Sequence, residues 1–108
     1  MDALRIHLDA ATTPRVLALA GEIDLATADE LRTVLDRTFA DDPDVVVDLG
    51  GVTFIDAAGI RAFLGAAAVL NGSGPLRVVN ARRLAWMLDL VGLAELETIV
   101  IDDGGHGR

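Results

Sequence analysis

The sequence has no cysteine, no lysine and no tyrosine, and it contains a single serine, Ser73. The absence of cysteine excludes disulfide scaffolds, cysteine-based zinc sites and thiol chemistry. The absence of lysine excludes a P-loop lysine, a Schiff-base lysine and the lysine used by two-component receiver domains. Few hydroxyl groups remain for nucleophilic catalysis or phosphorylation, so the composition argues against an enzyme.

Basic charge is also scarce, since nine arginines stand against 17 acidic residues and the formal net charge is −8 at pH 7. So acidic a chain does not neutralise phosphates, and we expect no nucleic-acid partner. The longest apolar stretch, residues 62–70, is far shorter than the ~20 residues that span a bilayer. The first residues lack the basic region and apolar run of a signal peptide. We therefore expect a cytoplasmic protein without membrane insertion.

The sequence also offers no convincing site for a metal or a cofactor. His7 and His106 are isolated from other ligand-type residues, and the acidic cluster at 41–44 lacks the spacing of a calcium loop. Gly50-Gly51 and Gly72-Ser73-Gly74 match neither of the glycine patterns that bind nucleotide phosphates. We expect no metal and no cofactor.

In the first half of the chain, the apolar pattern predicts two strands and a helix. Alternation over 4–9 indicates a strand with one solvated face, and the apolar run 16–20 indicates a strand buried on both faces. A helix follows, in which Thr27 and Glu30 have the spacing of a capping box. Its apolar stripe consists of Leu31, Val34, Leu35, Thr38 and Phe39, and it ends at residues 41–44.

In the second half, a β-branched strand at 45–49 is followed by a turn at Gly50-Gly51, and residues 52–55 lead to Asp56. A helix over 57–70, a strand over 76–79, a helix over 81–90 with Asn80 as its N-cap and a strand over 96–101 complete the pattern. The prediction is one α/β domain spanning 1–108, with helices packed on a mixed β-sheet in the order ββαβαβαβ. Its core covers residues 4–101, and 102–108 form a frayed tail.

Three motifs resemble those of STAS domains, the family that includes anti-sigma factor antagonists. The first runs from the strand at 45–49 through Gly50-Gly51 to Phe54-Ile55-Asp56-Ala57-Ala58-Gly59-Ile60. The second is Gly21-Glu22-Ile23-Asp24, which precedes the first helix, and the third is Leu90-Val91-Gly92-Leu93. The resemblance extends over residues 4–101, and the family's usual final helix has no counterpart.

The resemblance implies a STAS fold and a regulatory binding protein with no enzymatic activity. Such a protein would bind a kinase-type anti-sigma factor and free a sigma factor, which raises transcription. It would use the loop after the second strand and the start of the second helix. The partner-binding residues that the resemblance marks are Glu22, Asp24, Thr27, Asp56, Ala57, Ala58, Gly59 and Arg61.

The phosphoacceptor position of the family falls on Ala57. Phosphorylatable members read Asp-Ser-Ser-Gly or Asp-Ser-Thr-Gly where this chain reads Asp56-Ala57-Ala58-Gly59. Neither alanine has a hydroxyl group, so this site cannot accept phosphate. A phosphoryl group there would block a docked partner by size and by its nearly two negative charges. We therefore expect the surface to stay in its unmodified, binding-competent state.

Most of these residues also have a purely structural interpretation. Asp56 and Thr27 stand where helix N-caps stand, and Glu22 and Asp24 fit a solvated acidic turn. On the helix at 57–70, the predicted buried face is Ile60, Phe63, Leu64, Ala67 and Leu70. The opposite face is Ala57, Ala58, Arg61, Gly65 and Ala68, which fits either the close approach of a partner or high helix propensity alone. Trp86 and Met87 are expected in the core rather than in a contact patch.

Other functions stay open at this point. Some small STAS domains bind the ATPase subunit of a lipid-transporting ABC system and control its assembly. An enzyme or a receiver domain is disfavoured by the missing lysine and the shortage of nucleophiles.

Overall fold

The computed structural model of the protein describes residues 3–70, 75–82 and 99–102. Their elements follow in the order β1 (Arg5–Asp9), β2 (Val16–Ile23), α1 (Ala28–Asp41), β3 (Val46–Ile55), α2 (Ala57–Leu70), β4 (Leu76–Val79) and β5 (Ile99–Asp102). For the described residues this order agrees with the predicted one, except that β5 includes Asp102, which was predicted to begin the tail. Most of the helix expected over 81–90 lies outside the described residues, as do Ser73, Trp86, Met87 and the third motif.

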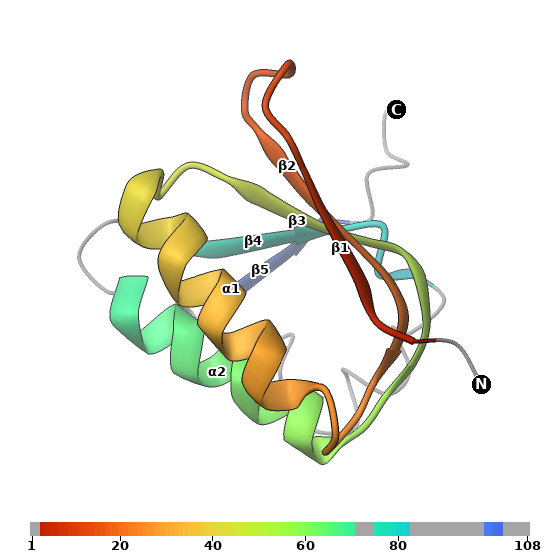
Figure 1. Ribbon diagram of the computed structural model, residues 1–108. Helices are drawn as coiled ribbons and strands as arrows, with labels where there is room; N and C mark the ends of the chain where they lie inside the picture. Colours follow the sequence, from red (N-terminus) through yellow and green to blue (C-terminus); the bar gives the residue numbers. More distant parts are fainter. Residues whose placement is uncertain (1–2, 71–74, 83–98, 103–108) are drawn as a thin grey trace.

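The strands form one sheet in the order β1-β2-β3-β4-β5. β1 is antiparallel to β2, whereas β2, β3, β4 and β5 all run parallel, so the predicted mixed sheet is confirmed. Parallel neighbours need crossover connections, and α1 and α2 supply two of them. Both helices therefore lie on the same face of the sheet (Figure 1).

The core lies between this face and the two helices. α1 buries Ala28, Leu31, Leu35 and Phe39, and it ends at Asp41, within the acidic cluster predicted to stop it. The four-residue spacing of the three larger side chains is that of one helix face, as predicted. No helix within the described part of the chain is long and apolar enough to cross a membrane.

β2 continues beyond its predicted end at residue 20 and includes Gly21, Glu22 and Ile23. Its residues alternate between buried and half-buried, with Leu17, Leu19 and Ile23 facing the core. The prediction of equal burial on both faces was wrong, because α1 and α2 cover only one face of the strand. The loop that carries part of the second motif begins only at Asp24.

Gly50 and Gly51 do not form the predicted turn, because β3 runs through both of them. The register of β3 against β2 shifts twice, once on either side of the pair Gly21–Val52, and each shift adds one residue to β3. These bulges let Leu49, Val52 and Ile55 all face the core although they are three residues apart. At the first bulge the strands approach so closely that a Cβ on Gly51 would lie 2.8 Å from the Cβ of Ala20.

Asn80, the predicted N-cap, uses its side chain to connect two strands. Its Nδ2 donates a 3.0 Å hydrogen bond to Oδ1 of Asp48, which also accepts from the backbone N–H of Gly50 at 2.7 Å. Asn80 has a left-handed backbone with φ of 57°, which asparagine tolerates better than most residues. Its side chain therefore connects the end of β4 to the bulged part of β3.

Candidate functional site

The candidate site lies where β2 and β3 end and where α1 and α2 begin, at one end of the molecule (Figure 1). The backbone N–H of Asp56 donates to the carbonyl of Ile23 at 3.1 Å and joins the two strand ends. Because β2 and β3 are parallel, the loop after each strand emerges at the same edge of the sheet. The predicted partner-binding residues all come from this end, so the structure brings the two motifs together.

Asp24 organises the turn between β2 and α1. Its Oδ1 accepts from the backbone N–H groups of Ala26 at 3.0 Å and Thr27 at 3.2 Å. Its carbonyl oxygen accepts from the N–H groups of Thr27 and Ala28 at 3.1 and 2.8 Å. The Thr27 hydroxyl in turn accepts from the N–H of Asp24 at 3.0 Å. The turn is therefore closed by hydrogen bonds from both sides.

The predicted capping box of Thr27 and Glu30 is absent. Thr27 occupies the N-cap position of α1, but its side chain makes no capping hydrogen bond to the helix. Its hydroxyl faces the oxygen atoms of Glu22 and Asp24 at 3.2–3.4 Å instead. Because β2 extends to Ile23, Asp24 is the first residue of the turn, and its carboxylate accepts from the N–H groups of Ala26 and Thr27, which precede α1.

Leu25 sits at the tip of this turn and is not among the predicted site residues. Its side chain is 78% exposed, the most exposed of the large hydrophobic side chains that the structure describes. Residue 25 is the position that would continue the buried alternation of Leu19 and Ile23, so the sequence pattern gives no signal of its exposure. A leucine held in solvent by a hydrogen-bonded turn is suited to contact a partner.

Asp56 caps α2 through its side chain. Its Oδ1 accepts from the backbone N–H groups of Ala58 at 2.9 Å and Gly59 at 3.1 Å, and its carbonyl accepts from Ile60. Ala57, the first residue of the helix, is exposed, whereas Ala58 and Gly59 are buried. Of the motif residues at the start of α2, Ala57 is thus the one open to a partner.

The exposed face of α2 differs from the predicted one. Arg61 and Ala68 are exposed as expected, but Ala58 is buried, and Gly65 lies under the guanidinium group of Arg32 from α1. Arg32 is held there by an ion pair between its Nε and the Asp36 carboxylate at 3.0 Å. The small residues at these two positions therefore serve packing within the protein, which leaves a narrower free surface.

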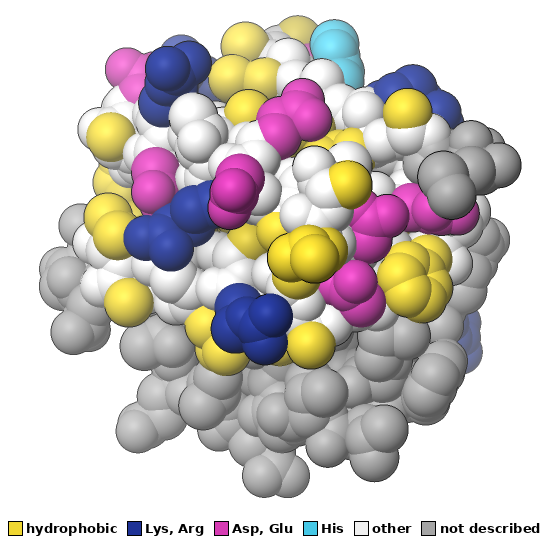
Figure 2. Space-filling model, turned by 60° about the horizontal axis from the view of Figure 1, so that its bottom comes forward, with side chains coloured by type: hydrophobic (Ala, Val, Ile, Leu, Met, Phe, Trp, Pro, Cys, Tyr) yellow, Lys and Arg dark blue, Asp and Glu magenta, His cyan; other side chains and the backbone are white. Residues whose placement is uncertain are grey.

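This end of the molecule is acidic around a few apolar side chains. Asp29 and Glu30 lie exposed in the first turn of α1, close in the chain to the half-buried Asp24, and Asp56 precedes α2. Carboxylates at helix N-termini are stabilised by the helix dipole. Figure 2 shows hydrophobic side chains set among acidic ones on this face, with arginine side chains at several places around and between them. A partner that fits here needs an apolar pocket and basic surroundings.

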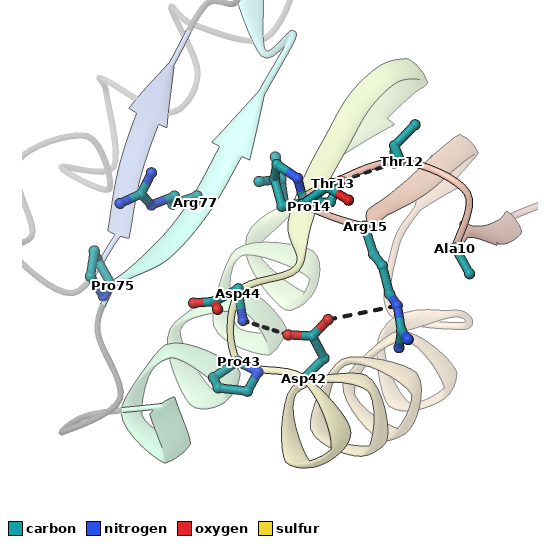
Figure 3. A pocket seen from close by; sticks show the side chains of 11 residues that line it. Ala10, Thr12, Thr13, Pro14, Arg15, Asp42, Pro43, Asp44, Pro75 and Arg77 are labelled. Atoms are coloured by element: carbon teal, nitrogen blue, oxygen red, sulfur yellow. Dashed lines mark hydrogen bonds and ion pairs between the residues drawn. The ribbon is translucent and has the colours of Figure 1, made fainter.

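A separate cavity of about 590 Å³ lies at the other ends of β2 and β3 (Figure 3). Arg15 projects there toward the end of α1 and forms ion pairs with Asp41 at 3.7 Å and Asp42 at 3.8 Å. Thr13, Pro14, Asp44, Pro75 and Arg77 also line the cavity, and none of the predicted site residues does. Among the described residues, no group of three His, Asp or Glu side chains is placed to hold a metal ion.

Comparison with known proteins identifies the family. A family model described as "Mlab, STAS domain" matches residues 6–101. The chain belongs to the STAS domain family. The predicted resemblance and the predicted fold are both confirmed.

Two solved structures show how far the STAS fold is shared. An anti-sigma factor antagonist from Mycobacterium paratuberculosis is 25% identical, with a TM-score of 0.78 over 94% of this chain and 87% of that one. The anti-sigma factor antagonist SpoIIAA in its unphosphorylated form is 19% identical, with a TM-score of 0.57 over 78% of this chain and 83% of that one. No curated protein matches the sequence.

Proposed function

We propose that this STAS domain is an anti-sigma factor antagonist, a regulatory protein without enzymatic activity. It binds a kinase-type anti-sigma factor through the turn after β2 and the start of α2, and it thereby frees a sigma factor. The similarity to the Mycobacterium paratuberculosis antagonist over most of both chains supports this function. The single observation that carries it is the closed turn that holds Leu25 in solvent beside the start of α2.

Within this proposal Leu25 and the predicted residues have different tasks. Leu25, Ala57 and Arg61 are exposed and make the contacts. Asp24 and Thr27 hold the turn and Asp56 holds the start of α2, so they act by positioning. A preorganised turn loses little conformational entropy on binding, which favours affinity. Glu22 adds negative charge at the base of the turn, while the buried Ala58 and Gly59 shape the surface from inside.

Binding is not switched by phosphorylation at the start of α2. Ala57 is exposed there, where a kinase could reach a hydroxyl group, but its side chain has none. Thr27 is the nearest hydroxyl in the turn, and it is half-buried with its oxygen engaged by the N–H of Asp24. We therefore infer a constitutively active antagonist.

The proposal is tested by titrating the purified protein with the kinase-type anti-sigma factors encoded in the same genome. Leu25→Asp should weaken the complex at least tenfold, or by about 1.4 kcal/mol, because it removes an apolar anchor and adds charge. Val69→Asp is the matched control, since Val69 is 60% exposed near the far end of α2. If Leu25→Asp leaves the affinity unchanged, or if both variants lose the same affinity, the assigned surface would be contradicted.

A second function is favoured by the description of the matching family model as an Mlab-type STAS domain. On this alternative the partner is the ATPase subunit of a lipid-transporting ABC system, and the domain controls its assembly. The same titration with such a subunit distinguishes the two functions. Binding to the ATPase subunit and to no anti-sigma factor would replace the first proposal by the second.

A further inference from the structure

The outer edge of β1 is a second surface of interest, on the side of the sheet rather than at its end. β2 is the only strand that pairs with β1 among the described strands, so β1 lies at the sheet edge (Figure 1). Its five residues pair one to one with β2 without a bulge, and none of them is lysine or proline. This edge therefore lacks a proline, a lysine and a bulge, three of the devices that prevent another strand from pairing.

The sequence of β1 is complementary to itself when it is read in the opposite direction. With His7 as the centre, Arg5 is opposite Asp9 and Ile6 is opposite Leu8. Opposite residues of antiparallel strands point to the same side of the sheet. One side then holds two Arg–Asp pairs around the two histidines, and the other side holds apolar pairs only.

We propose that β1 pairs antiparallel with β1 of a second copy of this chain, about a two-fold axis at His7, so that two sheets join into one. Leu8 is 40% exposed, and the half-buried Ile6 already packs against the core. Pairing of the two β1 strands buries the side chains of Ile6 and Leu8 further. A centre at Ile6 would place Arg5 opposite His7 and lose both Arg–Asp pairs, so the charges select the register centred on His7.

The Asp9 carboxylate can accept hydrogen bonds from Arg5 of a second copy while it keeps its contact within the chain. Its Oδ1 accepts from the backbone N–H of Ala11 at 3.0 Å, and its other carboxylate oxygen has no hydrogen-bond partner among the described residues. A carboxylate accepts several hydrogen bonds, so an arginine of the second copy adds to the turn contact rather than replacing it. The pairing also leaves the ends of β2 and β3 outside the interface, and it is independent of the proposed function.

The five paired residues form a smaller contact than the ~800 Å² per partner of a stable interface. The dimer should therefore be weak and concentration-dependent. Sedimentation equilibrium between about 10 µM and 1 mM tests this. The average mass should rise from 11.3 kDa toward twice that value with increasing concentration. A mass that stays at the monomer value throughout would overturn the proposal.

Charge reversal tests the register. Arg5→Asp places two carboxylates opposite each other and should weaken dimerisation at least tenfold, and Asp9→Arg should do the same with two guanidinium groups. The double variant Arg5→Asp/Asp9→Arg restores opposite charges and should regain dimerisation. Arg37→Asp, at an exposed position of α1, makes the same charge change away from the edge and should have no effect. A double variant as weak as the single ones would overturn the pairing.

The absence of cysteine allows a direct measurement of the axis. In the proposed dimer, residue 7 lies opposite itself, within the ~7 Å between Cα atoms that a disulfide requires. The two copies of residue 5 are about 13 Å apart along the strand direction. His7→Cys should therefore cross-link under mild oxidation much faster than Arg5→Cys. Equal rates for the two variants would contradict an axis at His7.

Discussion

Replacing Gly59 by alanine tests how closely α2 packs over the ends of β2 and β3. A Cβ at this position would lie 2.6 Å from Cγ2 of Ile23 and 2.7 Å from Cγ1 of Ile55, well inside carbon–carbon contact distance. Both isoleucines are fully buried, so neither can move aside without disturbing the core. Overpacking of this kind costs about 3 kcal/mol, and the helix propensity of alanine returns about 1 kcal/mol. We expect a net loss of about 2 kcal/mol.

Gly65→Ala in the same helix is the matched control. Its Cβ would meet the guanidinium group of Arg32, the end of a flexible and partly exposed side chain that can move into solvent. The variant gains about 1 kcal/mol of helix propensity and loses about 0.5 kcal/mol of an exposed ion pair. Urea unfolding with an unchanged slope gives both free energies of unfolding. A Gly59→Ala protein as stable as Gly65→Ala would refute the packing argument.

Two further predictions concern the residues that position the site. Asp56→Ala removes the acceptor for the N–H groups of Ala58 and Gly59. It should lower the free energy of unfolding, measured by urea unfolding, by about 1–2 kcal/mol. Asp56→Asn keeps an acceptor and should recover most of this loss. Asp24→Asn keeps an oxygen acceptor for the turn but removes the charge, so it should weaken binding of a basic partner severalfold at low salt and less at high salt. Asp24→Lys should abolish complex formation because it also removes the acceptor for the N–H groups of Ala26 and Thr27, and unchanged affinity would count against the turn as a contact.

The order and type of the described elements could be predicted because each follows from local periodicity. The bulges of β3 could not, since Leu49, Val52 and Ile55 are spaced by three, and the pattern reads as a strand, a turn and a segment that leads to Asp56. Only the pairing with β2 shows that the chain stays extended through both glycines. The register of β3 depends on its pairing with β2, a strand that is distant in the sequence, so the local sequence of β3 does not determine it.

The structure brings the predicted site residues to one end of the fold, but their burial and hydrogen bonds differ from those that the sequence pattern indicates. Asp24 and Thr27 are both of residue types that cap helices. Which of the two side chains accepts the N–H groups of the turn depends on where β2 ends. Leu25 looked like an ordinary apolar residue because its exposure results from the turn that follows the strand. Ala58 is predicted on the exposed face of the helix and Gly59 as a partner-binding residue, but both are buried, and Gly59 packs against Ile23 and Ile55. Exposure of this kind is a property of tertiary packing rather than of motif identity.

The central claim is that this chain binds a kinase-type anti-sigma factor without being switched by phosphorylation at the start of α2. The most direct measurement is the affinity for that partner before and after incubation with the partner, magnesium and ATP, with mass spectrometry of the protein. The account predicts unchanged affinity and no added phosphate for the wild type, and phosphate with lost binding for Ala57→Ser, since a phosphoserine there places about two negative charges in the contact. Phosphorylation of the wild-type chain, accompanied by release of the partner, would contradict it.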